Sequence, residues 1–273
     1  MPRSKSYNTY ANIQRPELRK RVDELLVKFE EDFYKKMSGA SEMLDTSKFD
    51  LDLYKRHNVE TILRIALKRA VDPLVANYWA TRDPQLCKEW GLYGAEEGRH
   101  DRMFAGDLHK VGMTDEQIYA NRPTFATELL NGYFYYTLAT EGPLASMISG
   151  FYLEYIATKT QPDWLNIMEQ HVGADKTKGA RAHIAFDIDD EHTDMVWNMI
   201  MRVIETEADE ERLVEHLIKI NSLFVSYFVE VYTATVLQKS GQLDASKLTQ
   251  AAPAAAVGLN LETLAAVSSG AGK

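Results

Sequence analysis

Acids and histidines with the spacing of metal ligands occur in two segments of the chain. The first segment is Glu96-Glu97-Gly98-Arg99-His100, in which Glu97 and His100 are three residues apart. Residues three or four apart lie on one face of a helix, so both side chains can bind one metal ion. Carboxylate and neutral imidazole are both common ligands of non-haem iron. Alone, this pair is a weak motif, because charged residues at this spacing also occur on solvated helices.

The second segment covers residues 183–194, which contain two of the seven histidines and five acids. A helix advances about 100° per residue, so His183, Asp187 and Asp190 share one face. Asp189 and His192 share another face. Apolar residues are interleaved with these polar ones, which indicates a helix that is buried on most sides. Buried acids need partners, and a metal ion is one such partner.

Two single glutamates stand beside apolar stretches. Glu154 lies in Phe151-Tyr152-Leu153-Glu154-Tyr155-Ile156, where a carboxylate is costly unless it is ion-paired, hydrogen-bonded to a tyrosine or bound to metal. Glu60 precedes an apolar stretch and is either a further carboxylate ligand or a residue favoured near a helix N-terminus. These glutamates and the two segments together supply the four to six ligands that a dinuclear site in a helical bundle needs. Three other histidines are expected at the surface: His109, His171 and His216.

The elements that must position these ligands are predicted to be helices, which makes the fold all-α. Gly and Pro are scarce before the C-terminal region, and no segment alternates with the period of two that strands show. Long helices are expected over about 15–37, 48–79, 83–110, 125–139, 143–160, 162–171, 175–205 and 209–239. Thr114 stands three residues before Gln117, a capping-box spacing that predicts a short helix.

Composition predicts the domain limits and narrows the class of protein. One helical domain is expected over 13–240, between a flexible N-terminal stretch 1–12 and an Ala/Gly/Ser-rich tail 241–273 of low order. The net charge of −9 argues against nucleic acid, because phosphate binding needs clustered Lys and Arg. No secretory signal and no apolar stretch of membrane-spanning length is evident in the sequence. We therefore expect a cytoplasmic protein that binds neither nucleic acid nor membrane.

The pattern of these residues resembles that of the haem-oxygenase-like diiron oxidases, a superfamily that shares a helical core with haem oxygenase and the TenA-type thiaminases. The likeness covers about residues 50–200. It is carried by Glu97-x-x-His100 with a Gly-Thr turn after it, and by His183-x-x-x-Asp187 followed by His192. The resemblance implies a haem-oxygenase-like helical bundle that holds two ferrous ions per chain. The implied metal ligands are Glu60, Glu97, His100, Glu154, His183, Asp187 and His192.

The position of His192 departs from this resemblance, because it lies two residues beyond the place that the superfamily spacing predicts. Either the helix is locally irregular, or Asp190 replaces the last histidine, or the second metal is held differently. A ferritin-like four-helix diiron bundle is the alternative fold. In that fold Asp189 and His192 would form the second pair, and His183 and Asp187 would have no role. The turn that follows the first pair favours the haem-oxygenase-like fold.

The resemblance also implies a function. Superfamily members make terminal alkenes from fatty acids, fragment or desaturate amino acids, or N-hydroxylate amines. We therefore expect an iron-dependent oxidoreductase that uses dioxygen to oxidise a small amino acid, amine or carboxylic acid. An external electron donor and a homodimer are compatible with this expectation. Two other functions compete with it: a metal-free TenA-like hydrolase, for which Cys87 is the only candidate nucleophile, and a non-catalytic iron-binding helical module.

Overall fold

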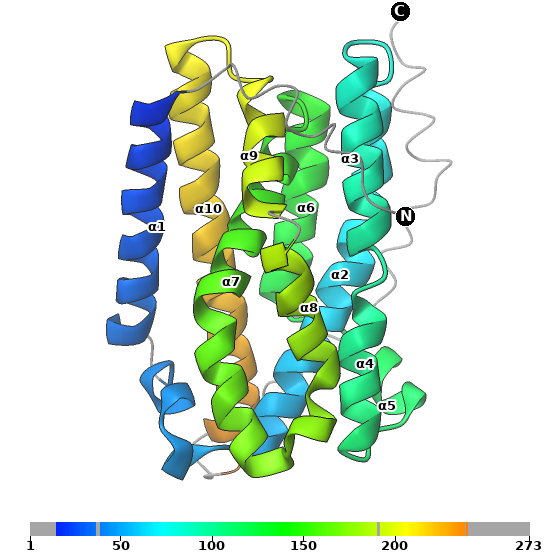
Figure 1. Cartoon of the computed structure of the whole chain (residues 1–273), viewed down its shortest axis with the longest axis vertical. Coiled ribbons are helices and arrows are strands. Elements are labelled where there is room, and N and C mark those ends of the chain that lie inside the picture. The colour runs from blue at the N-terminus through cyan, green and yellow to red at the C-terminus, as the bar shows by residue number, and fades with distance from the viewer. Residues whose placement is uncertain (1–14, 37–38, 190–191, 238, 240–273) are drawn as a thin grey trace, which may run out of the picture.

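The fold is a bundle of helices that run roughly along the long axis of the molecule (Figure 1). The computed structural model describes residues 15–36, 39–189, 192–237 and 239, and for residues 186–189 and 237 it describes the backbone alone. Within these ranges every regular element is helical, so the predicted all-α class is confirmed. The expected N-terminal stretch 1–12 and the tail 241–273 lie outside the described residues.

The α-helices are α1 (Pro16–Lys36), α2 (Leu51–Trp79), α3 (Pro84–Glu97), α4 (Asp101–Lys110), α5 (Asp115–Tyr119), α6 (Phe125–Thr140), α7 (Leu144–Val172), α8 (Lys178–Asp189), α9 (His192–Met201) and α10 (Glu207–Tyr232). Three short 3-10 helices, η2 (Ser41–Leu44), η3 (Thr46–Lys48) and η4 (Ala174–Lys176), lie in the connections. The π-helix η5 (Thr233–Leu237) follows α10 directly.

Several helices begin where side chains satisfy the free backbone N–H groups of the first turn. The Asp50 side chain accepts hydrogen bonds from two amides at the start of α2, and the Asp83 side chain does the same for α3. Thr114 and Gln117 form the predicted capping box at the start of α5. A cap of this kind stabilises a helix by about 1 kcal/mol, so these residues fix the helix starts.

One of the expected long helices is divided into two, because the expected helix 83–110 is interrupted between Glu97 and Asp101. The expected helix 175–205 is described as α8 and α9, and residues 190 and 191 between them lie outside the described residues. α3 lies end to end with α4, and α9 lies end to end with α8, with both junctions near mid-height in the bundle (Figure 1). By contrast, the expected helices 143–160 and 162–171 form the single helix α7, which contains Pro162 in its interior.

The junctions between α3 and α4 and between α8 and α9 lie where two hydrophobic cores meet. The larger core contains Tyr93 and Met195, and the smaller core contains Phe104 and Ile184. Tyr93 and Phe104 stand on either side of the α3–α4 junction in sequence, and Ile184 and Met195 stand on either side of the α8–α9 junction. Two polar side chains at these junctions, His100 and His192, are buried.

The contact of α8 with α4 depends on Gly179. A Cβ atom added there would lie 2.0 Å from the carbonyl oxygen of Met103, whereas one added at Gly91 would meet nothing within 4 Å. We expect Gly179→Ala to force α8 away from α4 and to lower the free energy of unfolding by about 2–3 kcal/mol. The matched variant Gly91→Ala should raise it by about 0.5–1 kcal/mol, because alanine favours an exposed helix interior. Urea denaturation measures both changes, and equal midpoints for the two variants would contradict this packing.

Candidate metal centre

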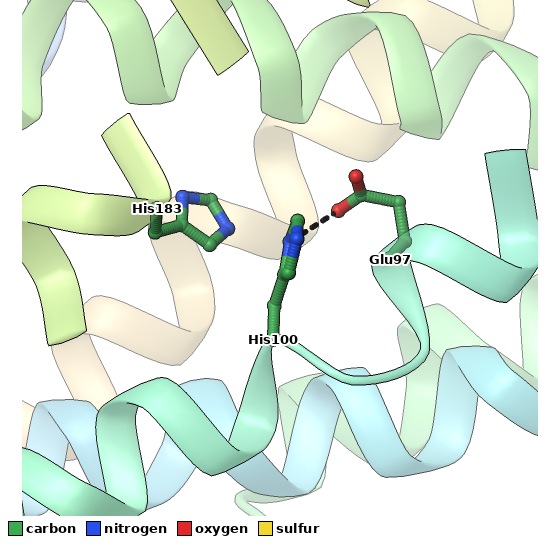
Figure 2. Close-up of side chains that lie close together, drawn as sticks. All are labelled: Glu97, His100 and His183. Carbon is green, nitrogen blue, oxygen red and sulfur yellow. Dashed lines mark ion pairs between the residues drawn. The ribbon is translucent and has the colours of Figure 1, made fainter. Parts of the chain in front are cut away.

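Five of the sequence-predicted ligands come together at the level of the α3–α4 and α8–α9 junctions. Glu97 is the last residue of α3, His100 directly precedes α4, and His192 is the first residue of α9. Glu154 lies on α7 and His183 on α8. Donor atoms of Glu97, His100 and His183 all lie within 4.8 Å of one another, and so do donor atoms of Glu97, Glu154 and His192. Figure 2 shows the first group, with the His100 ring between the side chains of Glu97 and His183.

Glu97 belongs to both groups, and its two carboxylate oxygens face different histidines. Oε2 of Glu97 lies 2.9 Å from Nδ1 of His100 (Figure 2). Oε1 of Glu97 lies 3.5 Å from Nδ1 of His192. Because a carboxylate presents two acceptor oxygens, one side chain in this position can contact two cations at once. The arrangement is that of two adjacent ligand sets joined by one shared carboxylate.

The remaining contacts complete the two sets. The rings of His100 and His183 meet edge to face with 4.5 Å between their centroids, and Phe104 lies against His183. On the other side, Nδ1 of His192 lies 3.7 Å from Oε2 of Glu154. Each set therefore combines imidazole nitrogen with carboxylate oxygen, the mixed donor chemistry that suits iron, manganese or zinc.

Burial and charge both favour cations at this place. The side chains of Glu154 and His192 are almost fully buried, with relative exposures of 3% and 2%. Three carboxylates approach His192, because Oε2 of Glu96 lies 3.8 Å from its Nε2, in addition to the contacts with Glu97 and Glu154. Clustered acids in a low-dielectric environment repel one another unless protons or cations neutralise them. Glu96 is the member of this cluster that the sequence analysis did not single out.

Tyr93 orients Glu154 from α3. Its hydroxyl donates a hydrogen bond of 2.9 Å to Oε1 of Glu154. Burial raises the pKa of Tyr93 well above its usual value of about 10, and the nearby charges of Glu154 and Glu97 raise it further. The hydroxyl therefore keeps its proton and remains a donor at neutral pH.

We expect Tyr93→Phe to weaken iron binding by roughly 10–100-fold, because groups that orient metal ligands have effects of this size. The loss should be measured by anaerobic titration with ferrous iron. The phenyl ring fills the same space, but Oε1 of Glu154 loses this donor, so the metal-free protein should lose about 1–2 kcal/mol of stability and remain folded at the temperature of the titration. Unchanged iron affinity in this variant would show that Glu154 does not depend on Tyr93 for its position.

Glu60 lies outside both groups, although the sequence analysis placed it among the ligands. Its side chain is fully buried. Oε2 accepts a hydrogen bond of 2.8 Å from Arg56, one turn earlier on α2, and Oε1 accepts from both N and Oγ1 of Thr124. Both oxygens are thus occupied by an ion pair and by the start of α6, and the side chain joins these two helices.

The remaining predicted ligands belong to the end of α8 and to the segment between α8 and α9. The side chains of Asp187 and Asp189, and the whole of Asp190, lie outside the described residues, so their roles remain predictions. Residues 190 and 191, which connect α8 to α9, also lie outside the described residues, so the explanations offered for the spacing of His192 remain predictions. His192 itself, the first residue of α9, faces Glu97 and Glu154.

Of the histidines that were expected at the surface, two lie there and one does not. His109 and His171 are exposed, as predicted. The prediction for His216 was wrong, because its side chain is buried on α10 and Nδ1 lies 2.6 Å from the hydroxyl oxygen of Tyr133. Charged neighbours in sequence suggested exposure, but His216 points to the face of α10 that packs against α6.

Comparison with known proteins defines the fold. No family model and no curated protein matches the chain. One similar solved structure is a domain of unknown function with a haem oxygenase-like fold from Shewanella denitrificans, with a TM-score of 0.73, 20% identity, and coverage of 81% of this chain and 95% of that one. Another is a TenA homologue from Pseudomonas syringae pv. tomato, with a TM-score of 0.52, 12% identity, and coverage of 69% and 82% respectively.

The chain therefore has the haem oxygenase-like fold, which confirms the favoured prediction over the ferritin-like alternative. Within that fold it carries a buried cluster of histidines and glutamates that could hold metal. Among the described residues, no helix is long and apolar enough to cross a membrane.

Proposed function

We propose that this chain is a non-haem diiron oxidase that uses dioxygen to oxidise a small amino acid, amine or carboxylic acid. The observation that carries the proposal is the shared carboxylate of Glu97, whose two oxygens face His100 and His192. A mononuclear site would not need two ligand sets joined in this way.

In this proposal one ferrous ion would be held by Glu97, His100 and His183, and the other by Glu97, Glu154 and His192. Asp187, one helical turn after His183 on α8, is the candidate to complete the first set. Bound ferrous iron would supply electrons for the reduction of dioxygen. The residues of the chain hold the ligands in place, exclude water by burial, and keep a proton on Tyr93 beside Glu154.

A cavity next to the ligands gives room for a small substrate. Its walls include Glu97, Glu154 and His183, and its volume is about 90 Å³. Several charged residues of α2 also line it, among them Arg64 and Lys68. The site is therefore both buried and adjacent to space that a small polar molecule can occupy, as an oxidase requires. A reaction in which the substrate does not supply every electron would also need an external donor.

Metal content and oxygen consumption test the proposal together. The purified protein, freed of metal and titrated anaerobically with ferrous iron, should bind two ions per chain. Addition of oxygen to this form should produce a transient visible absorption and consume dioxygen, whereas the zinc-loaded protein should do neither. Fewer than one iron per chain, or two irons that leave dissolved oxygen unchanged, would count against a diiron oxidase.

The competing functions lack a comparable observation. The hydrolase alternative needs Cys87 as nucleophile, but this residue lies on α3 and lines neither the cavity beside the ligands nor the larger aromatic cavity that adjoins it. The non-catalytic module predicts iron binding without oxygen consumption. The oxygen measurement above therefore separates it from the oxidase.

A further inference from the structure

An aromatic cavity adjoins the cavity beside the metal centre. Nine aromatic side chains line it, including Trp164, Phe224 and Tyr227, and its volume is about 140 Å³. This is close to the ~150 Å³ of an apolar protein cavity that binds benzene, so it can hold one aromatic ring. The two cavities share six lining residues: Thr61, Arg64, Phe104, Leu153, Ala157 and Gln161.

Arg64 provides a positive charge at the junction of the two cavities. Its guanidinium carbon lies 4.9 Å from the ring centroid of Phe224 and 4.8 Å from that of Tyr227. Nη2 donates a hydrogen bond of 3.4 Å to Oγ1 of Thr61, whereas Nη1 is buried and has no hydrogen-bond partner among the described residues. Nor does any described carboxylate form an ion pair with Arg64, unlike Arg56 and Arg69 on the same helix. A partly buried cation that lacks a carboxylate partner is strongly stabilised when an anion binds to it.

Among the described residues that line the aromatic cavity, Arg64 is the one that carries a positive charge at pH 7. Nδ1 of His57 lies 3.1 Å from the hydroxyl oxygen of Tyr227. Burial, with a smaller contribution from the charge of Arg64, lowers the pKa of His57 to about 3, so this imidazole is neutral at pH 7. Among the described lining residues, Glu30 on α1 is the acid and Arg64 is the one Lys or Arg.

We propose that the substrate is a monocarboxylate with one aromatic ring, in which the carboxylate pairs with Arg64 and the ring occupies the aromatic cavity. A guanidinium group matches a carboxylate with two parallel hydrogen bonds, which fixes orientation as well as affinity. Because Arg64 also lines the cavity beside the metal ligands, this orientation turns the carboxylate end of the substrate toward the metal centre. The inference rests on the proposed oxidase function and narrows its substrate class to aromatic acids, in preference to simple amines.

Binding of model compounds tests the inference without turnover. Calorimetry would compare 3-phenylpropionate, its uncharged amide 3-phenylpropanamide, and 2-phenylethylamine on the metal-free and the iron-loaded protein. We expect the carboxylate to bind at least about tenfold more tightly than the amide or the amine. Arg64→Gln should weaken binding of the carboxylate by roughly 10–100-fold and change binding of the amide by less than about threefold. Arg64→Lys should retain part of the preference, because it keeps the charge and loses the paired geometry.

Lys55→Gln is the matched control, because Lys55 carries the same charge on the same helix and lines neither cavity. This variant should bind 3-phenylpropionate as the unmodified protein does. Equal affinity of the carboxylate for the Arg64→Gln and unmodified proteins, or tighter binding of the amine, would overturn the inference.

Iron content, measured on the same samples, separates this inference from the proposed function. Two irons per chain with no preference for the carboxylate would be consistent with the oxidase proposal and would contradict the substrate assignment. A carboxylate preference that depends on Arg64, in a protein that binds no iron, would contradict the oxidase proposal. The aromatic cavity would then be a binding site for carboxylic acids.

Discussion

Replacement of Glu97 by glutamine is expected to reduce ferrous iron from two per chain to one or fewer, and to lower oxygen consumption by more than about 100-fold. Residues that only orient ligands already change metal affinity by roughly 10–100-fold, and Glu97 is a candidate ligand of both ions. Its two oxygens face His100 and His192, whereas an amide offers one oxygen and no negative charge. Anaerobic iron titration and an oxygen electrode measure the two losses.

Glu89→Gln is the matched control for this prediction. Glu89 is a buried glutamate on the same helix, and its side chain accepts a hydrogen bond from Gln85. Burial raises its pKa, so the neutral amide resembles the form that this environment favours. The variant should bind two irons and unfold at nearly the same urea concentration. If Glu97→Gln also bound two irons with the affinity of the unmodified protein, the shared-carboxylate arrangement would be wrong.

The sequence made the residue types of this site predictable, but not the backbone that brings them together. The spacing of Glu97 and His100 suggested one helical face, yet the structure places a helix end and a turn between them. Gly98 forms that turn: a Cβ atom there would lie 2.9 Å from the carbonyl oxygen of Gly94. Helical periodicity applies only within a continuous helix, so it could not predict how side chains on either side of a break are oriented.

The role of His192 was also open from the sequence. Counting along one helix placed it two residues out of register with His183, so helical periodicity assigned it no partner. In the structure His192, the first residue of α9, meets Glu97 and Glu154 in the second candidate ligand set, whereas His183 belongs to the first.

Glu60 and Glu154 show that buried carboxylates with similar sequence surroundings can have different kinds of partners. Both were singled out because a carboxylate stands near apolar residues of a predicted helix, and both are buried. Their partners differ, because Glu154 meets Tyr93 and His192 whereas Glu60 meets Arg56 and Thr124. Arg56 lies four residues before Glu60, a spacing that favours an ion pair and that the sequence displays. The contact with Thr124 joins residues 64 positions apart and could not be inferred locally.

Loss of Glu60 should therefore reduce stability without removing metal. Glu60→Ala is expected to lower the free energy of unfolding by about 3 kcal/mol, because it removes one member of a buried ion pair and the acceptor for the N-terminus of α6. Glu60→Gln should have a smaller effect, since its amide oxygen can still accept from Thr124. Urea denaturation of the metal-free protein measures both changes.

Iron content distinguishes this structural role from the ligand role that the sequence suggested. Both Glu60 variants should still bind two irons per chain at temperatures where they are folded, since neither group of candidate ligands includes Glu60. Glu128→Gln is a suitable control, because its ion pair with Arg122 is at the surface and should change stability by less than about 1 kcal/mol. A Glu60→Gln protein that kept its stability and lost one iron would instead place Glu60 at the metal centre. The same glutamate would then have to leave Arg56 and Thr124 to reach the metal, and α2 and α6 would lose the contact that joins them.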